Sequence, residues 1–193
     1  MGEAISETSL PQSLNVSKTP VREALQELER EGLVQIFPKH GTFVFEASPG
    51  LVREISDFRL MLETVALERV MASRWGQLVD HLEPVVAALE NAITADDLVV
   101  CRRLDATLHS GIMARCGNTF PEEAHAAIEF RVQALRTPLS TAADNNDRTM
   151  GEHRNLSAAI EDRDAPRALE ILRNHILQTR ESCLSQMLQA PRK

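Results

Sequence analysis

The sequence has few of the residues on which several classes of protein depend. Tyrosine is absent, and only one tryptophan and six phenylalanines occur among 193 residues, which argues against binding single-stranded nucleic acid by stacking bases on aromatic rings. The three cysteines form no CxxC pair, so we expect reduced thiols in place of a disulfide framework. No apolar run of about 18 residues and no secretory signal is present. The sequence thus predicts a cytoplasmic protein without a membrane partner.

The composition that remains is that of a globular protein with an acidic surplus. Hydrophobic residues make up 43% of the chain and the formal net charge is −7. This charge counts against non-specific binding to nucleic acid, although it leaves room for a local DNA-reading surface. The composition changes near residue 48, where the Ser, Pro and Gly of "EASPG" are typical of a linker. We therefore predict two domains, residues 1–47 and residues 48–193.

The stretch "VSKTPVREALQELEREGLV" predicts a short helix with marked ends. Ser17 is a candidate N-cap, and Pro20 falls in the first turn, where its missing N–H costs little. Gly32 marks the end of the helix. Apolar residues at helical spacing predict one buried stripe: Val21, Ala24, Leu25 and Leu28. After the helix, "LVQIF" and "TFVF" flank "PKHG", which predicts a β-hairpin.

Together with a weaker short helix around Leu10 and Leu14, these elements outline a winged helix-turn-helix. In such a unit the second helix enters the major groove of DNA. Lys18 and Arg22 lie four residues apart on the face away from the apolar stripe, from which they could reach phosphates or guanine edges. The alternative is that both are ordinary solvated residues. Residues 1–46 carry four basic and seven acidic side chains, whereas a basic patch is the usual footprint of a DNA-binding domain.

The remainder of the chain is predicted to be helical throughout. Its apolar periodicity marks six helical segments, and the architecture that we expect is an all-α bundle of six or seven helices. The predicted fold class is therefore mainly α. Asp164, followed by Ala165 and Pro166, is a typical start for the last helix. The predicted ranges are 50–74, 77–94, 96–116, 119–137, 143–161 and 165–188.

Four polar residues fall on the apolar stripes of these helices. Asp105 and His109 share a stripe with apolar residues in the third predicted helix, His153 lies on the stripe of the fifth, and His175 on that of the sixth. A buried carboxylate or imidazole needs a partner. One aspartate and three neutral imidazoles that converge on a divalent cation would satisfy all four.

Other interpretations of the same residues stay open at this point. A lone histidine on an apolar face is more often a hydrogen-bonded core residue than a ligand. Asp105 and His109 could also form a simple pair one helical turn apart. The two further histidines of this region, His81 and His125, have no comparable setting and are interpreted as structural or surface residues.

The run "VSKTPVREALQELEREGLVQIFPKHGTFV" closely resembles the DNA-binding signature of GntR-family bacterial transcription regulators. The resemblance implies that the recognition helix contacts double-stranded operator DNA and that His40 and Gly41 form the tip of the wing. The DNA-binding residues implied are Ser17, Lys18, Thr19, Arg22, His40 and Gly41.

Two departures from the family pattern bear on DNA binding. Members of the family usually have one more helix before the region where this sequence starts, and Pro11 stands where the short upstream helix should be running. An interior proline can cost about 3 kcal/mol. We expect either that the sequence starts too late or that this chain has lost some affinity for DNA.

The helical region resembles the FCD effector domain of the FadR-like branch of the same family, through "RLMLE", "LDATLHSGIMARCGN" and "EHRNLSAAIEDRDAPRALEILRNHI". In many FCD domains an aspartate and three histidines bind a divalent metal. The matching residues are Asp105, His109, His153 and His175. Zinc is the expected metal, and nickel or iron suits the same donors.

The resemblance further implies that a small organic acid binds the metal through its carboxylate. An arginine could hold the other end of this ligand bidentately. Arg59, Arg131 and Arg136 are candidates, of which we favour Arg59 and Arg131.

The sequence therefore predicts a ligand-responsive transcription regulator that binds DNA as a homodimer and is not an enzyme. Two rivals remain. A sensor that has lost DNA binding would explain the apparently absent first helix. A metal-dependent enzyme could use open metal positions to activate water, but no separate general base is identifiable and the N-terminal motif would stay unexplained.

Overall fold

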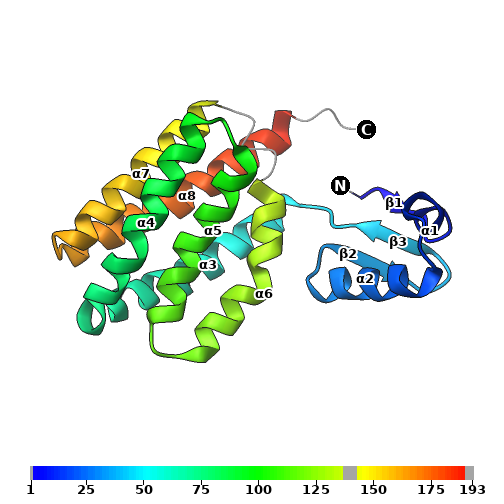
Figure 1. The fold of residues 1–193 in the computed structure, drawn as a ribbon, viewed down its shortest axis with the longest axis horizontal. Coiled ribbons are helices and arrows are strands. Elements are labelled where there is room, and N and C mark those ends of the chain that lie inside the picture. Colours follow the sequence, from blue (N-terminus) through cyan, green and yellow to red (C-terminus); the bar gives the residue numbers. More distant parts are fainter. Residues whose placement is uncertain (1, 137–142, 190–193) are drawn as a thin grey trace.

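The computed structural model describes residues 2–136 and 143–189, with the backbone alone described for 143–147. Figure 1 shows a helical bundle and a small N-terminal unit joined by the segment between β3 and α3. The fold is mainly α, with a winged helix-turn-helix unit followed by an all-α domain, as predicted from the sequence. Residue 137, the last of the fourth predicted helix, lies outside the described residues, as do the outermost ends of the two predicted domains.

The N-terminal unit consists of two helices and three short strands. The strands form an antiparallel sheet in the order β1-β3-β2. The predicted hairpin is present, with Val34 opposite Val44 and Phe37 opposite Gly41. The strand β1 was not predicted, because its two residues pair with β3 without a period of their own. The elements are β1 (Ala4–Ile5), α1 (Ser9–Leu14), α2 (Lys18–Arg30), β2 (Val34–Phe37) and β3 (Gly41–Val44).

Pro11 does not interrupt the helix in which it lies. It is the third residue of α1, and the N–H groups of a first helical turn have no partner within the helix, so a proline there removes no hydrogen bond. Its ring is buried, and Asn15 ends the helix in a left-handed conformation with φ of 53°. The expected cost of an interior proline therefore does not apply to α1.

Helix α2 begins after Ser17 and presents its apolar stripe to the unit's small core. Val21 and Leu25 are buried, whereas Ala24, predicted to belong to the stripe, is exposed. Ser17 occupies the N-cap position, but its side chain makes no capping hydrogen bond. Gly32 follows the helix with φ of +71°, a conformation that favours glycine.

Among the described residues six helices form the bundle, and their bounds lie within two residues of the prediction wherever both are described. Ser48 caps α3 by accepting a hydrogen bond from the Leu51 N–H, and Pro49 occupies the first turn. None of the described helices is both long and apolar enough to cross a membrane. The helices are α3 (Pro49–Ser73), α4 (Trp75–Thr94), α5 (Leu98–Arg115), α6 (Thr119–Arg136), α7 (Ala143–Glu161) and α8 (Ala165–Gln189).

The bundle has a main apolar core and a second cluster where the N-terminal unit joins it. Phe45, just after β3, is buried and packs in this second cluster with Val52 and Ile55 of α3, Leu135 of α6 and Cys183 of α8. The segment between the predicted domains is thus anchored on the bundle by an aromatic side chain. Within the bundle, α3, α5, α7 and α8 also enclose a cluster of buried polar side chains, which includes Glu63, Asp105, His109, His153 and His175.

Candidate metal centre and ligand pocket

Asp105, His109, His153 and His175 meet at the centre of the bundle. Asp105 and His109 lie one turn apart on α5, His153 comes from α7 and His175 from α8. Each side chain is buried, with no residue more than 5% exposed. One possible ligand atom from each lies within 4.8 Å of the others. The structure therefore brings together all four residues that the sequence singled out as metal ligands.

His109 and His175 point the same ring nitrogen at the centre of this cluster. Their Nε2 atoms lie 3.2 Å apart. Each Nδ1 atom lies 2.7 Å from a glutamate oxygen, that of Glu63 for His109 and that of Glu152 for His175. Burial lowers the pKa of His109, and lowers that of His175 to about 3. Both rings are thus held in the neutral form that metals bind.

His153 is the least satisfied polar side chain of the cluster. It is 1% exposed, and neither of its ring nitrogens has a hydrogen-bond partner among the described residues. Its Nε2 atom lies 3.2 Å from Asp105 Oδ1, without the geometry of a hydrogen bond. A buried polar group in this state calls for a missing partner. A cation at the centre would be such a partner, so the residues fit a divalent metal.

Asp105 is held by Arg136, from the end of α6. The guanidinium donates to both carboxylate oxygens, with Nη2 to Oδ1 at 2.6 Å and Nη1 to Oδ2 as the second hydrogen bond. Burial would raise the pKa of Asp105, but Arg136 and the neighbouring histidines hold it well below its usual range. Asp105 is therefore ionised at neutral pH and able to act as an anionic metal ligand.

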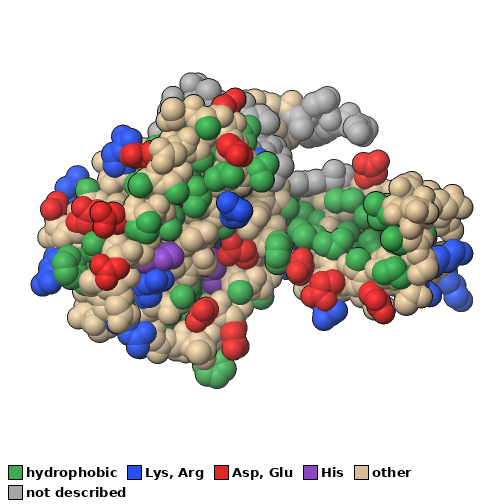
Figure 2. Space-filling model, in the orientation of Figure 1, with side chains coloured by type: hydrophobic (Ala, Val, Ile, Leu, Met, Phe, Trp, Pro, Cys, Tyr) green, Lys and Arg blue, Asp and Glu red, His purple; other side chains and the backbone are tan. Residues whose placement is uncertain are grey.

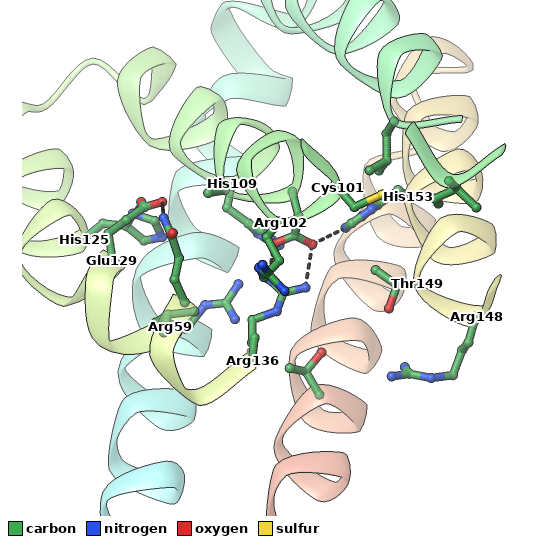
Figure 3. Close-up of a pocket in the computed structure, with 17 residues that line it drawn as sticks. Arg59, Cys101, Arg102, His109, His125, Glu129, Arg136, Arg148, Thr149 and His153 are labelled. Atoms are coloured by element: carbon green, nitrogen blue, oxygen red, sulfur yellow. Dashed lines mark hydrogen bonds and ion pairs between the residues drawn. The ribbon is translucent and has the colours of Figure 1, made fainter. Parts of the chain in front are cut away.

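A pocket opens onto this cluster. Its empty volume is about 870 Å³, including the solvent at its mouth. Asp105, His109 and His153 line it, together with apolar residues such as Leu89 and Val132. Figure 3 shows the basic side chains around it. The arginines that line the pocket are Arg59, Arg102, Arg136 and Arg148.

Of the two arginines favoured for ligand binding, one lines the pocket and the other does not. Arg59 is 3% exposed and donates from Nε to Glu63 Oε1 at 2.6 Å. Arg131 lies instead against Gly32 of the N-terminal unit, where a Cβ on the glycine would overlap the guanidinium. The Arg131 Nε atom is buried there without a hydrogen-bond partner among the described residues.

The structure also shows polar residues near the centre that the sequence did not reveal. Glu63 is fully buried, and its pKa lies well below the usual range because Arg59 and His109 outweigh the effect of burial. His125, interpreted as structural or surface, is 4% exposed and lies 3.4 Å from Glu63 Oε1. The spacing of Arg59 and Glu63 was a usable signal, since residues four apart can pair on a helix. His81 is half-buried and lies near the Thr107 carbonyl.

The residues proposed to bind DNA are all exposed on the N-terminal unit. Ser17 is the N-cap of α2, Lys18, Thr19 and Arg22 lie in its first turns, His40 lies in the turn between β2 and β3, and Gly41 begins β3. Figure 2 shows Lys and Arg side chains gathered at the far edge of this unit and acidic side chains along its lower side. The start of α2 and the hairpin turn are thus both free to approach a partner.

Two families match this chain. Residues 1–44 match the bacterial regulatory proteins of the gntR family, and residues 54–178 match the FCD domain. A relative from Streptomyces ambofaciens, an uncharacterized HTH-type transcriptional regulator in an unstable DNA locus, is 34% identical over 165 residues, which cover 82% of this chain and 61% of the relative. The gluconate operon transcriptional repressor of Bacillus subtilis is 26% identical over 179 residues, which cover 90% of this chain and 72% of the repressor.

The chain spans 61% of the length of the Streptomyces relative and 49% of that of the regulator YdhC of Bacillus subtilis. Among solved structures, a GntR transcriptional regulator from Rhodococcus sp. RHA1 has a TM-score of 0.80 at 18% identity, covering 99% of this chain and 89% of that one. The metal-free FCD domain of TM0439 has a TM-score of 0.66 at 17% identity, covering 75% of this chain and 99% of that domain. These similarities show the fold. The families and relatives matched are transcription regulators and not enzymes.

Proposed function

The chain belongs to the gntR family of bacterial regulatory proteins and carries an FCD domain, and from this premise we propose that it is a ligand-responsive transcription regulator. It acts in the cytoplasm, where it binds operator DNA through α2 and the β2–β3 turn. Its bundle binds a divalent metal together with a small organic acid. The observation that carries the proposal is the buried cluster of one aspartate and three histidines, in which His153 has no hydrogen-bond partner among the described residues and from which Asp105, His109 and His153 line an arginine-lined pocket.

Asp105, His109, His153 and His175 would hold the metal. Three neutral imidazoles and one carboxylate suit zinc first, with nickel or iron as alternatives. A metal bound by four protein ligands that keeps further positions open supplies a point of attachment for a carboxylate. Arg136 already occupies both oxygens of Asp105, so the proposal requires that Asp105 share its charge between the guanidinium and the cation.

The pocket arginines select an acidic ligand. In our proposal Arg59, which was favoured from the sequence and lines the pocket, holds the far end of a carboxylate ligand; Arg136 and Arg148 also line the pocket. A guanidinium can bind a carboxylate through two parallel hydrogen bonds. The apolar residues of the lining, among them Leu89 and Val132, suit the hydrocarbon part of an organic acid. Arg131 is not among the residues that line the pocket; it contacts Gly32 of the N-terminal unit instead.

Helix α6 connects the pocket with the DNA-binding unit. It places Arg136 on Asp105 at one end, and one turn and a half earlier it places Arg131 on Gly32, directly after the recognition helix. A ligand that moves Arg136 would therefore shift the contact beside α2. In our proposal the ligand favours one relative placement of two DNA-binding units and so changes operator affinity.

The two DNA-binding units belong to a homodimer, since a two-fold operator needs a two-fold protein. Met61 and Val65 lie four residues apart on α3 and are 63% and 54% exposed. They offer an apolar surface that a second copy would cover.

A mobility-shift assay with DNA from upstream of the protein's own gene tests the regulator proposal. We expect binding that resists excess unrelated DNA, weakens with salt and is reduced by Arg22→Ala. Native mass spectrometry of the same sample should show a dimer with about one divalent metal per subunit. A chain that binds all DNA equally, or none, would contradict DNA recognition, and a chain that refuses added zinc and nickel would contradict the metal site.

A further inference from the structure

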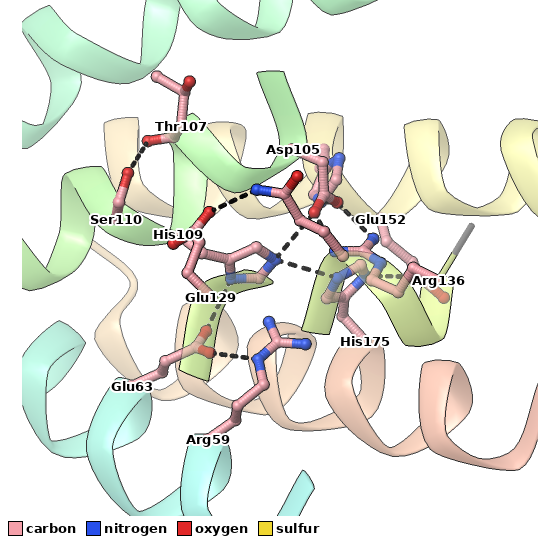
Figure 4. A network of polar contacts seen from close by, with 12 residues as sticks. Arg59, Glu63, Asp105, Thr107, His109, Ser110, Glu129, Arg136, Glu152 and His175 are labelled. Carbon is pink, nitrogen blue, oxygen red and sulfur yellow. Dashed lines mark hydrogen bonds and ion pairs between the residues drawn. The ribbon is translucent and has the colours of Figure 1, made fainter. Parts of the chain in front are cut away.

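Two similar chains of polar contacts lead from the pocket to the cluster. In the first, Arg59 Nε donates to Glu63 Oε1 at 2.6 Å, and Glu63 Oε2 lies 2.7 Å from His109 Nδ1. Figure 4 shows this chain crossing from α3 to α5. Glu63 is 0% exposed and Arg59 is 3% exposed. The contact therefore lies away from competing water.

The second chain repeats this order on other helices. Arg148 Nη1 donates to Glu152 Oε1 at 2.7 Å, and Glu152 Oε2 lies 2.7 Å from His175 Nδ1. Both arginines stand four residues before their glutamates on one helix, and both glutamates reach a histidine on a different helix. Both arginines also line the pocket. The two chains thus meet the cluster with the same chemistry.

The glutamates determine which ring nitrogen carries the proton. An ionised carboxylate only accepts hydrogen bonds, so the Nδ1 atoms of His109 and His175 must be the donors. Each neutral ring has one proton, and both Nε2 atoms are therefore unprotonated. They face each other at 3.2 Å and cannot hydrogen-bond to each other. Two lone pairs at this distance are stabilised by a cation between them.

We propose that Glu63 and Glu152 are positioning residues of the metal centre, which fix the tautomer and orientation of His109 and His175. The inference rests on the proposed metal binding and extends it to residues that bind no metal themselves. A carboxylate that accepts a hydrogen bond from a metal-binding histidine holds the ring in place and makes its other nitrogen a stronger ligand for the metal. Neither ring nitrogen of His153 has a hydrogen-bond partner among the described residues, so the centre has two histidines with a carboxylate behind the ring and one without.

The principal test measures zinc affinity of the full chain by competition with a coloured chelator. Glu152 is the residue to change, because its side chain is 16% exposed and the variant is expected to fold. We expect Glu152→Gln to weaken zinc binding by roughly 10- to 100-fold, the usual effect of losing such a partner. Glu63→Gln should have a similar effect, with greater risk to folding because Glu63 is fully buried.

Glu90→Gln is the matched control. Glu90 also pairs with an arginine of α7, Arg154, at 2.8 Å, but this pair is partly exposed and touches no histidine. Like Glu152→Gln, this variant removes one negative charge and weakens an ion pair of α7. We expect its zinc affinity to stay within about twofold of the wild type, since exposed ion pairs contribute little.

The tautomer gives a second measurement, which needs no metal. Nitrogen NMR of the metal-free protein labelled at histidine should show His175 protonated at Nδ1 in the wild type, and Glu152→Ala should shift it toward the Nε2-protonated form. A change confined to general stability would leave the tautomer unaltered. Equal zinc affinities for Glu152→Gln and Glu90→Gln, with the tautomer unaltered, would overturn the inference alone. A wild-type chain that binds no zinc would overturn the metal proposal and the inference with it.

Discussion

The bundle and the N-terminal unit place their polar functional residues in opposite ways. The bundle buries Asp105, His109, His153 and His175 among apolar side chains, whereas the N-terminal unit exposes Lys18, Arg22 and every other residue proposed to bind DNA. A buried polar group must find a partner within the protein or in a bound ligand, so its contacts reveal its chemistry. An exposed polar group forms hydrogen bonds with water, so the structure of the unbound protein does not reveal its binding partner. The comparison teaches that the bundle's site can be inferred from unsatisfied atoms, and the DNA-binding surface only from sequence and family.

The sharpest test of this comparison removes one histidine from each region. His109→Ala should lower zinc affinity by at least about 100-fold, because it removes a ligand and leaves its neighbours unpaired. His40→Ala, at the exposed β2–β3 turn, should leave zinc affinity unaltered. Native mass spectrometry with added zinc would measure both. Wild-type zinc affinity in His109→Ala would mean that His109 is a structural polar residue and not a metal ligand.

Acid should destabilise the metal-free bundle more than the N-terminal unit. Burial lowers the pKa of His175 from 6.5 to about 3, so the unfolded chain binds this proton more readily than the folded one. Stability from this residue is present above pH 6.5 and declines toward pH 3, by on the order of 1 kcal/mol per pH unit. Urea unfolding with chelator present, at pH 7.5, 6.5 and 5.5, would measure the slope. His175→Asn should flatten it, and an equally steep slope in this variant would assign the effect to other groups.

On the DNA-binding side, Arg22→Ala should weaken specific operator binding by roughly 1–3 kcal/mol if Arg22 contacts a guanine. Zinc affinity should not change, since Arg22 is exposed on α2, far along the chain from the cluster. Fluorescence anisotropy with a labelled operator, at one fixed salt concentration, would measure the loss. Unchanged affinity would remove Arg22 from the set of DNA-contacting residues.

The contact between Gly32 and Arg131, which links the two regions, should affect the free energy of unfolding and neither the zinc nor the DNA site directly. Gly32→Ala places a side chain at φ of +71° and against Arg131, and a strained backbone of this kind costs on the order of 1–3 kcal/mol. Urea unfolding would measure the loss. Adding Arg131→Ala should recover the part that comes from overlap and leave the part that comes from φ. A Gly32→Ala variant as stable as the wild type would show that the guanidinium moves aside freely.

The sequence predicted the helical architecture because apolar periodicity and capping residues are local signals. Ser48 and Pro49 mark the start of α3, and Ser17 that of α2. The strand β1 escaped prediction because two residues carry no period, and only their pairing with β3 makes them a strand. Ala24 followed the apolar spacing of α2, yet it is exposed, and only Val21 and Leu25 of the predicted stripe are buried.

The candidate site was predictable only as far as single helices reveal it. The inward positions of the three histidines followed from helical period. Glu63 and Glu152 were not found, because each contacts a histidine on another helix, and helical spacing says nothing about such a contact. Arg131 was favoured by its residue type alone, and the packing of α6 turns it toward Gly32 and turns Arg136 toward Asp105.

Gly32 and Arg131 also set a condition on exchanging parts between regulators. A chimaera that joins residues 1–47 of this chain to another helical domain would keep the bare backbone of Gly32 and lose the guanidinium that covers it. The reverse graft would bring Arg131 against whatever side chain stands at the end of a foreign recognition helix. The two residues lie about a hundred positions apart in the printed sequence and must be transplanted as a pair, because either one alone leaves a gap or a collision at the seam.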